Sequence, residues 1–137
     1  MKNFEKNFKY LDNIENLNEK FFPHNDLIKI YKNNHLYINL ARIESFGISI
    51  IEALASGLPV ITFDTKGGNE LIINDFNGII VNNLSHEKMV DAISLYSKNE
   101  VLYKKHEKNT ISSIENFDLS LIAKKTIKGY EEIIKNF

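Results

Sequence analysis

The sequence contains no cysteine, which excludes several kinds of chemistry. Without thiols the chain has no disulfide framework, no thiolate ligand for a metal and no cysteine nucleophile. Charge of one sign is also lacking, because 17 basic and 18 acidic residues give a formal net charge of -1. The lysines lie between acidic residues instead of forming a basic run, so nucleic acid is not an expected partner.

Long apolar runs are missing as well. The apolar stretch at 48–51 stops at Glu52, far short of the roughly 20 apolar residues that span a bilayer. No apolar stretch of signal-peptide length follows Met1, so a cytoplasmic protein is expected. The composition that is present, 43% hydrophobic and 26% charged, is that of a globular protein. A length of 137 residues fits one domain.

Short extended patterns alternate with helical ones along the chain. The strand candidates are 36–39, 60–63 and 79–81, and the second is the clearest because its residues are β-branched or aromatic. A further apolar burst at 20–22 ends at Pro23. Helices are predicted at 3–18, 25–31, from 45 or 46 to 56, 70–73, 85–95, 99–115 and 119–136. Apolar strands separated by helices indicate an α/β fold with a parallel sheet covered by helices.

The helix predicted to end near residue 56 is apolar nearly all round, which is typical of a helix buried on several sides. Glu52 lies in the middle of it, and a buried carboxylate is costly unless it is paired or hydrogen-bonded. Two interpretations remain open from these residues alone. Glu52 either forms a salt bridge or faces solvent at the rim, or it accepts hydrogen bonds from the hydroxyl groups of a ligand.

The start of the same helix is a second candidate feature. The first N–H groups of a helix lack internal partners and carry the positive end of its dipole, so they suit a phosphate or a sugar oxygen. Gly47 has no side chain and allows a ligand close to this backbone. The alternative is structural: Ser45 is the N-cap, and Glu44 is an acid favoured near a helix start.

Glu44 and Glu52 are separated by seven residues, and Ala-Leu-Ala-Ser-Gly-Leu-Pro-Val follows at 53–60. This arrangement resembles the signature of retaining family 4 glycosyltransferases, E-G-F-G…E-A-x-A-x-G-x-P-V. The family also tends to have D-x-G-G-x-x-E and N-G-x-L-V downstream, which this chain matches at Asp64, Gly67, Glu70, Asn77, Gly78 and Val81. The resemblance extends from Lys20 to the C-terminus.

The resemblance implies the GT-B fold, in which two Rossmann-like lobes face each other and the C-terminal lobe holds most of the nucleotide sugar. The whole chain, 1–137, then corresponds to an incomplete C-terminal lobe with a parallel sheet and flanking helices. Glu44 is implied as the catalytic residue, which meets hydroxyl groups of the donor sugar. The donor-binding set implied by the family is Glu44, Ser45, Phe46, Gly47 and Ile48 at the sugar and diphosphate, with Glu52 at the ribose.

By the same resemblance, the chain is the donor-binding part of a retaining glycosyltransferase. Such an enzyme moves a sugar from a nucleoside diphosphate to an acceptor, here in glycan or glycolipid synthesis. No cluster of metal-binding residues is visible in the sequence, in agreement with the family's usual metal independence, and no cofactor is expected beyond the nucleotide-sugar donor. None of the four histidines matches a catalytic position of the family.

The resemblance also implies partners. The acceptor-binding lobe is missing or is supplied by a second chain, and the full enzyme is compatible with peripheral membrane association. The family's diphosphate-binding Arg and Lys, with the first strands of the lobe, precede the matched stretch. We therefore expect weak donor binding, an unpaired edge on the strand at 36–39 and no sugar transfer by this chain alone. The alternatives are a non-catalytic nucleotide-sugar-binding module, a partner subunit of a split enzyme, or a degenerate remnant without a ligand.

Overall fold

The structure, a computed structural model, describes residues 24–136 of the chain. Three parallel strands form one sheet in the order β1-β2-β3, with β1 at Tyr37–Asn39, β2 at Val60–Phe63 and β3 at Gly78–Val81. This confirms the predicted α/β fold with a parallel sheet. The helix predicted at 3–18 and the apolar burst at 20–22 lie outside the described residues.

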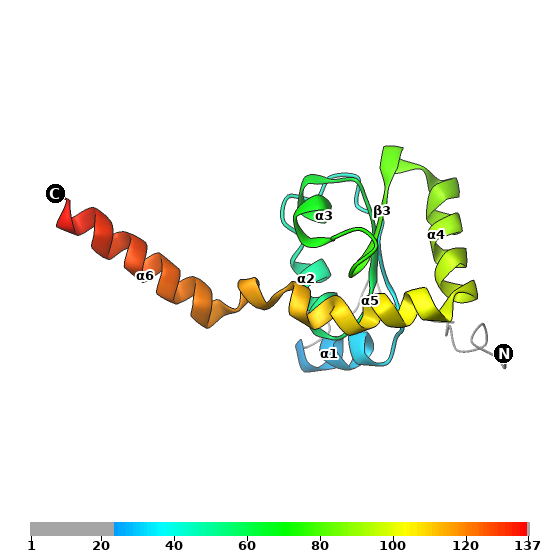
Figure 1. The fold of residues 1–137 in the computed structure, drawn as a ribbon, viewed down its shortest axis with the longest axis horizontal. Coiled ribbons are helices and arrows are strands. Elements are labelled where there is room, and N and C mark those ends of the chain that lie inside the picture. The colour runs from blue at the N-terminus through cyan, green and yellow to red at the C-terminus, as the bar shows by residue number, and fades with distance from the viewer. Residues whose placement is uncertain (1–23, 137) are drawn as a thin grey trace.

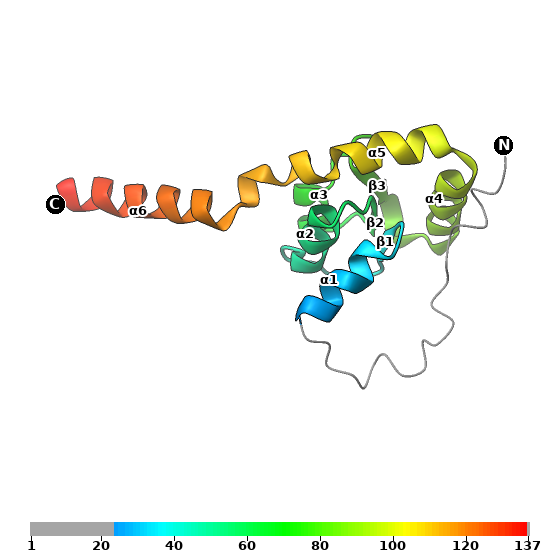
Figure 2. The same cartoon turned by 90° about the horizontal axis from the view of Figure 1, so that it is seen from below.

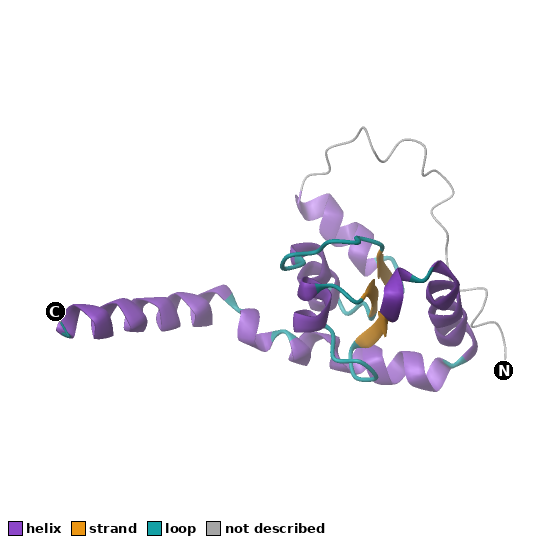
Figure 3. Cartoon of the chain, turned by 90° about the horizontal axis from the view of Figure 1, so that it is seen from above, coloured by secondary structure: helices purple, strands orange, loops and turns teal. Residues whose placement is uncertain are grey.

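Helices precede, separate and follow the strands (Figure 1). They are α1 (His24–Lys32), α2 (Ile48–Ala55), α3 (Lys66–Leu71), α4 (His86–Lys98), α5 (Glu100–Ser113) and α6 (Leu119–Lys135). Two short 3-10 helices, η3 (Asn82–Leu84) and η4 (Glu115–Phe117), follow β3 and α5. Figure 3 shows the same elements by type, with the strands at the centre of the molecule.

The sheet lies between two core clusters, because successive side chains of a strand point to opposite faces. Val60 of β2 belongs to the cluster that contains Ile50 of α2 and Leu71 of α3. Its neighbours Ile61 and Phe63 belong to the second cluster, which is formed mainly with α4 and α5. Figure 2 shows α1, α2 and α3 on one side of the sheet and α4 on the other. All four residues of β2 are buried, which explains why this strand was the clearest in the sequence.

The predicted start of α2 is wrong. We expected it at Ser45 or Phe46, but α2 begins at Ile48 and its N-cap is Gly47. Gly47 has a φ of 92°, a left-handed conformation that residues other than glycine rarely adopt and that interrupts a helix. Ser45 is therefore not the N-cap of this helix. The predicted end is confirmed to within one residue, because Gly57 follows it as expected.

The short helix predicted at 70–73 is also misplaced. The structure has α3 at Lys66–Leu71 instead, since the Thr65 hydroxyl accepts a hydrogen bond from the Gly68 N–H at 3.1 Å and starts the helix. Ile72 is already extended. Two glycines in the first turn have low helix propensity, which concealed this start in the sequence.

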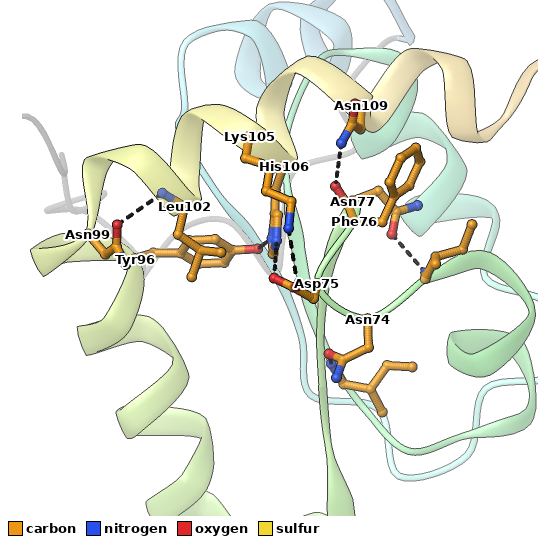
Figure 4. Close-up of polar contacts among 12 residues, drawn as sticks. Asn74, Asp75, Phe76, Asn77, Tyr96, Asn99, Leu102, Lys105, His106 and Asn109 are labelled. Atoms are coloured by element: carbon orange, nitrogen blue, oxygen red, sulfur yellow. Dashed lines mark hydrogen bonds and ion pairs between the residues drawn. The ribbon is translucent and has the colours of Figure 1, made fainter.

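The Asn77 side chain holds together the turn that leads into β3 (Figure 4). It is fully buried, and its amide donates to the Leu71 carbonyl at 3.0 Å and to the Ser113 hydroxyl at 2.9 Å. Its carbonyl oxygen accepts from the Ile73 N–H at 2.8 Å. Both polar ends of the amide are thus satisfied within the protein, which gives this motif residue a structural role.

Among the described residues, β1 lies at an edge of the sheet and α6 lies outside the packed part of the molecule. β1 pairs only with β2 among the described strands, so it forms one edge of the described sheet, and the unpaired edge expected for the whole chain stays a prediction. α6 extends away from the rest of the molecule and has no buried residue (Figure 1). Within residues 24–136, no helix combines the length and the apolar character needed to cross a membrane.

A buried histidine joins α4, α5 and the turn before β3 (Figure 4). The Nδ1 of His106 lies 2.6 Å from the Tyr96 hydroxyl, and its Nε2 lies 3.4 Å from Asp75 Oδ1. An ionised carboxylate only accepts, so Nε2 carries the proton and Nδ1 accepts from Tyr96. Burial lowers the pKa of His106, and the neighbouring Asp75 only partly opposes this shift. His106 is therefore a neutral structural residue.

This buried neutral histidine makes the folded chain sensitive to mild acid. The pKa of His106 is lower in the folded state than its ordinary 6.5, so its contribution to stability is complete above pH 6.5 and is lost as the pH falls below that value. We expect His106→Gln to lower the free energy of unfolding at neutral pH by about 1–3 kcal/mol. We also expect it to reduce the further loss between pH 7 and pH 5.

Urea unfolding at both pH values measures this effect. His86→Gln is the matched control, because His86 is exposed at the start of α4. This variant is expected to keep the acid sensitivity of the wild type. If His106→Gln lost as much stability between the two pH values as the wild type, the buried histidine would not be the source of the effect.

Candidate functional site

The candidate site lies where β1 and β2 end. The carboxyl ends of adjacent parallel strands meet at one edge of the sheet, and ligands of open α/β sheets bind outside that edge. The connection at 40–47 follows β1 and leads into α2, and the connection at 64–65 follows β2 and leads into α3. The N–H of Gly67, in the first turn of α3, donates to the carbonyl of Glu44 at 2.8 Å. The connection after β1 therefore packs directly against the first turn of α3.

Gly67 is the point of closest approach between these segments. A Cβ atom on Gly67 would lie 2.7 Å from the carbonyl carbon of Phe46 and 2.9 Å from Cγ of Glu44. Both distances are shorter than any ordinary contact of a Cβ atom, and the first involves backbone that cannot rotate away. The sequence presented Gly67 only as part of a motif. In the structure it is the residue that lets the segment carrying Glu44 pack onto α3.

Glu44 is partly buried, and Asn39 lies beside its carboxylate. The Nδ2 of Asn39 is 3.5 Å from Glu44 Oε2, a long contact, while Oδ1 accepts from the Ala41 N–H at 3.0 Å. Asn39 is the last residue of β1 and only 7% exposed. It thus links the strand end to both the loop and the carboxylate. Sequence reasoning missed this role, although a polar residue ending an apolar strand was a signal for it.

Three other residues that were predicted to contact the donor lie on the surface of the protein. Ser45, Phe46 and Ile48 are exposed, with Phe46 at 40% and Ile48 at 67%. The Phe46 ring packs edge-on against the ring of Phe117 in η4, with 5.8 Å between centroids. This contact fixes one side of the phenylalanine and leaves the segment around it open to a ligand.

Gly47 has a structural role at the start of α2. It is buried, and a Cβ atom there would lie 3.0 Å from Ile50 Cδ1 and 3.1 Å from Leu71 Cδ1. The glycine therefore has a role in the turn and beside the core, and its implied place in donor binding stays a prediction. No described side chain caps α2, and the Gly47 carbonyl accepts from the N–H groups of Ile50 and Ile51. The first N–H groups of α2 thus remain suited to an anion.

Glu52 lies farther along α2, on the wall of a pocket between α1 and α2. The pocket has a volume of about 290 Å³. The residues that line it are Leu27, Ile28, Tyr31, Lys32, Glu52, Ala55 and Ser56. The Tyr31 hydroxyl donates to Glu52 Oε2 at 3.2 Å. Burial and, to a lesser extent, the charge of Glu52 raise the pKa of Tyr31, which keeps this donor protonated.

The arrangement decides part of the question that the sequence left open. Glu52 is partly buried and forms no salt bridge among the described residues, so its observed protein partner is a hydroxyl group. The structure brings Glu44, Phe46 and Gly47 together at the strand ends, whereas Glu52 lines the separate pocket, which Glu44 does not reach. In the described part of the chain, no three His, Asp or Glu side chains are grouped so that they could hold a metal ion.

The close approach at Gly67 gives a direct test of the site's scaffold. Gly67→Ala is expected to lower the free energy of unfolding by about 1–3 kcal/mol, because the added methyl group would overlap the backbone of Phe46. Gly129→Ala is the matched control, since a Cβ atom there would meet nothing within 4 Å. That change is expected to be neutral or to stabilise the chain by up to about 1 kcal/mol. Equal behaviour of the two variants in urea unfolding would contradict the tight contact.

Known sequences that are similar to this chain are glycosyltransferases. A model of the family described as glycosyl transferases group 1 matches residues 2–113. The N,N'-diacetylbacillosaminyl-diphospho-undecaprenol alpha-1,3-N-acetylgalactosaminyltransferase of Campylobacter jejuni is 27% identical over 111 residues, which are 81% of this chain and 30% of that protein. The GtfA subunit of the UDP-N-acetylglucosamine--peptide N-acetylglucosaminyltransferase of Streptococcus gordonii is 44% identical over 52 residues, or 38% of this chain and 10% of that protein. The chain thus spans less than a third of the length of these relatives.

Solved structures show the same fold. The sucrose-phosphate synthase from Thermosynechococcus elongatus superposes with a TM-score of 0.77 at 22% identity, covering 85% of this chain and 29% of that one. The C-terminal domain of a glycosyl transferase group 1 family protein from Francisella tularensis gives a TM-score of 0.63 at 23% identity, covering 69% and 49%. The family match over residues 2–113 establishes that the chain belongs to the glycosyl transferases group 1 family.

Proposed function

We propose that this chain is the donor-binding part of a retaining glycosyltransferase, corresponding to an incomplete C-terminal lobe of a GT-B enzyme. The full enzyme would transfer a sugar from a nucleoside-diphosphate sugar to an acceptor in glycan or glycolipid synthesis. The observation that carries this proposal is the contact of the Glu44 carbonyl with the Gly67 N–H, at the strand ends. This contact holds in place the segment that carries the Glu44 carboxylate and leads into the uncapped N-terminus of α2.

The two features at this edge suit different parts of the donor. The first N–H groups of α2 and the helix dipole favour the negative diphosphate. Glu44 repels phosphate but accepts hydrogen bonds, so it suits the hydroxyl groups of the sugar. In the proposed complex Glu44, with Asn39 beside it, orients the sugar at the reacting carbon, and the exposed residues Ser45 and Phe46 border it.

Glu52 suits the ribose. Its Oε2 accepts from Tyr31, and its Oε1 has no hydrogen-bond partner among the described residues, so it is available to a ligand hydroxyl. Hydrogen bonds to an ionised group are stronger than those between neutral groups, which favours a carboxylate over an amide at this position. The apolar wall provided by Leu27 and Ile28 would exclude water from that bond.

A second candidate is a partner subunit of a split enzyme. The observation that favours it is the short span of this chain relative to its relatives, one of which is named as a subunit. In this case the acceptor-binding lobe is a separate chain. A cytoplasmic location, independence of metal ions and peripheral membrane association of the full enzyme belong to the same proposal and stay predictions.

The assigned roles predict different effects for the two glutamates. Glu52→Gln is expected to weaken binding of a nucleoside diphosphate, because hydrogen bonds to a charged group contribute about 1.5–3 kcal/mol, roughly a 10- to 150-fold change in Kd. Glu44→Gln is expected to leave this affinity nearly unchanged but to reduce the preference for the nucleotide sugar. Calorimetric titration with UDP, GDP and their sugars measures both, and Glu87→Gln on the exposed side of α4 is the control.

Tyr31→Phe provides a further check on the Glu52 assignment. It removes the hydroxyl that donates to Glu52 and keeps the ring, so the pocket retains its shape. Because only the orientation of the carboxylate is affected, we expect a smaller loss of affinity than with Glu52→Gln. Equal loss of diphosphate affinity in Glu44→Gln and Glu52→Gln would refute the division of roles.

The proposal also predicts that the chain has no transferase activity alone. Transfer requires that an acceptor be held against the reacting carbon of the donor, which the donor-binding part does not do by itself. Release of nucleoside diphosphate from a panel of nucleotide sugars is measured with the 137-residue chain alone and with an acceptor-binding lobe added as a second chain. Acceptor-dependent turnover by the chain alone would contradict the proposal, and turnover only with the added lobe would support it.

A further inference from the structure

The turn that leads into β3 contains the only Asn-Gly pair of the sequence, Asn77 and Gly78. In a flexible chain such a pair is chemically unstable, because glycine has no side chain to shield its backbone nitrogen from the neighbouring amide. The proposed function gives this pair no role in donor binding. The sequence alone presents Asn77 as a candidate for spontaneous deamidation.

This reaction needs only water as a co-reactant. The Gly78 nitrogen attacks Cγ of Asn77, a bond forms between the two atoms, and the side-chain nitrogen leaves as ammonia with the proton of the Gly78 N–H. The cyclic imide that results then adds water. Opening of the ring at Cγ gives aspartate, and opening at the main-chain carbonyl carbon gives isoaspartate. Either product has a carboxylate in place of the neutral amide, and an ionised carboxylate only accepts hydrogen bonds.

The fold requires the glycine of this pair. A Cβ atom at Gly78 would lie 2.3 Å from the carbonyl oxygen of Val60 and 3.0 Å from Cγ2 of Ile72. The Val60 carbonyl belongs to the buried central strand β2, to which β3 is paired, so this backbone does not give way. A larger residue at this position would separate the two strands, and the reactive nitrogen therefore stays unshielded.

The fold also requires the asparagine. Its amide donates to the Leu71 carbonyl and to the Ser113 hydroxyl, and its carbonyl oxygen accepts from the Ile73 N–H. Only a side-chain amide both donates twice and accepts in this way, and aspartate has the same shape without the donors. Asn77 and Gly78 are thus each fixed by the structure, so the unstable pair is a consequence of the fold.

The same contacts suppress the reaction while the turn is closed. The Gly78 nitrogen reaches Cγ of Asn77 only if the side chain rotates, and rotation breaks the hydrogen bonds of the amide. The side chain is fully buried, so water does not replace those bonds. The main-chain carbonyl of Asn77 also accepts from the Val60 N–H at 3.4 Å, which ties this backbone to β2.

Side chains of α5 hold the turn closed. Ser113 accepts from Asn77, and the Asn109 amide donates to the Phe76 carbonyl at 3.1 Å (Figure 4). Asp75, which pairs with α5 side chains, has a φ of 61°, a conformation that is unfavourable for residues other than glycine. A strained turn that depends on one helix opens when that helix separates from it.

The product of the reaction does not fit the closed turn. Aspartate at position 77 would place a carboxylate oxygen against the Leu71 carbonyl, where the amide of Asn77 now donates. This pairs two acceptors and buries a charge without a donor in that direction. Isoaspartate would lengthen the main chain between the turn and β3 and would disturb the bond to the Val60 N–H.

We infer that Asn77-Gly78 is a latent modification site, which deamidates only when the turn opens away from α5 and whose product prevents the turn from closing again. The modified fraction therefore grows with the time that the turn spends open. This inference does not rest on the proposed donor site, and its failure would leave that proposal unchanged.

The first experiment measures deamidation of Asn77 in the full chain by mass spectrometry of the peptide that contains it. The rates are compared in buffer and in guanidinium chloride at the same pH and temperature. We expect the folded chain to react roughly tenfold or more slowly, because reaction requires opening. Equal rates in the two solutions would show that the closed turn gives no protection and would overturn the inference.

The second experiment tests the contact with α5. Ser113→Ala removes the hydroxyl that accepts from Asn77, and Ser112→Ala is the matched control, because the Ser112 hydroxyl is exposed and donates to the Asn109 carbonyl of its own helix. In buffer, Ser113→Ala is expected to deamidate roughly fivefold or more faster than the wild type. Ser112→Ala is expected to keep the wild-type rate. Equal rates in both variants would contradict control by α5.

The third experiment examines the product directly. Asn77→Asp has the side chain of one deamidation product, and Asn82→Asp adds the same charge at an exposed position just after β3. In urea unfolding we expect Asn77→Asp to increase the unfolded fraction roughly tenfold or more, and Asn82→Asp to behave as the wild type. Failure of Asn77→Asp alone to fold would support the inference. An Asn77→Asp chain as stable as the wild type would show that the turn closes on the product, and the inference would be wrong.

Discussion

The close approach of two backbone segments at Gly67 is the constraint on which the rest of the site depends. β1 and β2 are parallel, so the connections that follow them leave the same edge of the sheet and compete for the same space. The hydrogen bond from the Gly67 N–H to the Glu44 carbonyl joins the segment after β1 to the start of α3. Gly67 has no side chain, so the two backbone segments can approach each other this closely. Because Gly47 then turns the chain directly into α2, the position of Glu44 and the position of the helix start are fixed together.

α2 extends this constraint to the pocket that Glu52 lines. It is anchored in the core by Ile50, Ala53 and Leu54, while its start faces the strand ends and Glu52 faces α1. A helix packed in this way is rigid over its length, so the separation between its uncapped end and the Glu52–Tyr31 pair does not vary freely. For the proposed function this means that one helix would contact two neighbouring parts of the donor. The diphosphate would lie at its start and the ribose farther along it.

Local sequence patterns correctly predicted those elements whose bounds depend on residues close together in the sequence. β2 was predicted with correct bounds because a short β-branched and aromatic run fits a buried central strand. The starts of α2 and α3 were wrong, since one depends on a left-handed backbone at Gly47 and the other on the Thr65 cap before two glycines. The hydroxyl of Tyr31 meets Glu52 across two helices, and such a contact between distant residues leaves no periodic signal in the sequence.

α6 also shows how much a sequence pattern can predict. Its amphipathic pattern predicted the helix correctly, but the pattern states only that an apolar face exists and not what covers it. The structure adds that none of the described residues outside α6 buries a side chain of this helix. The base of this helix is not remote from the candidate site, because Phe117, in the turn that leads into α6, packs against Phe46. The segment that borders the proposed donor sugar and the segment that directs α6 away from the molecule therefore share one aromatic contact.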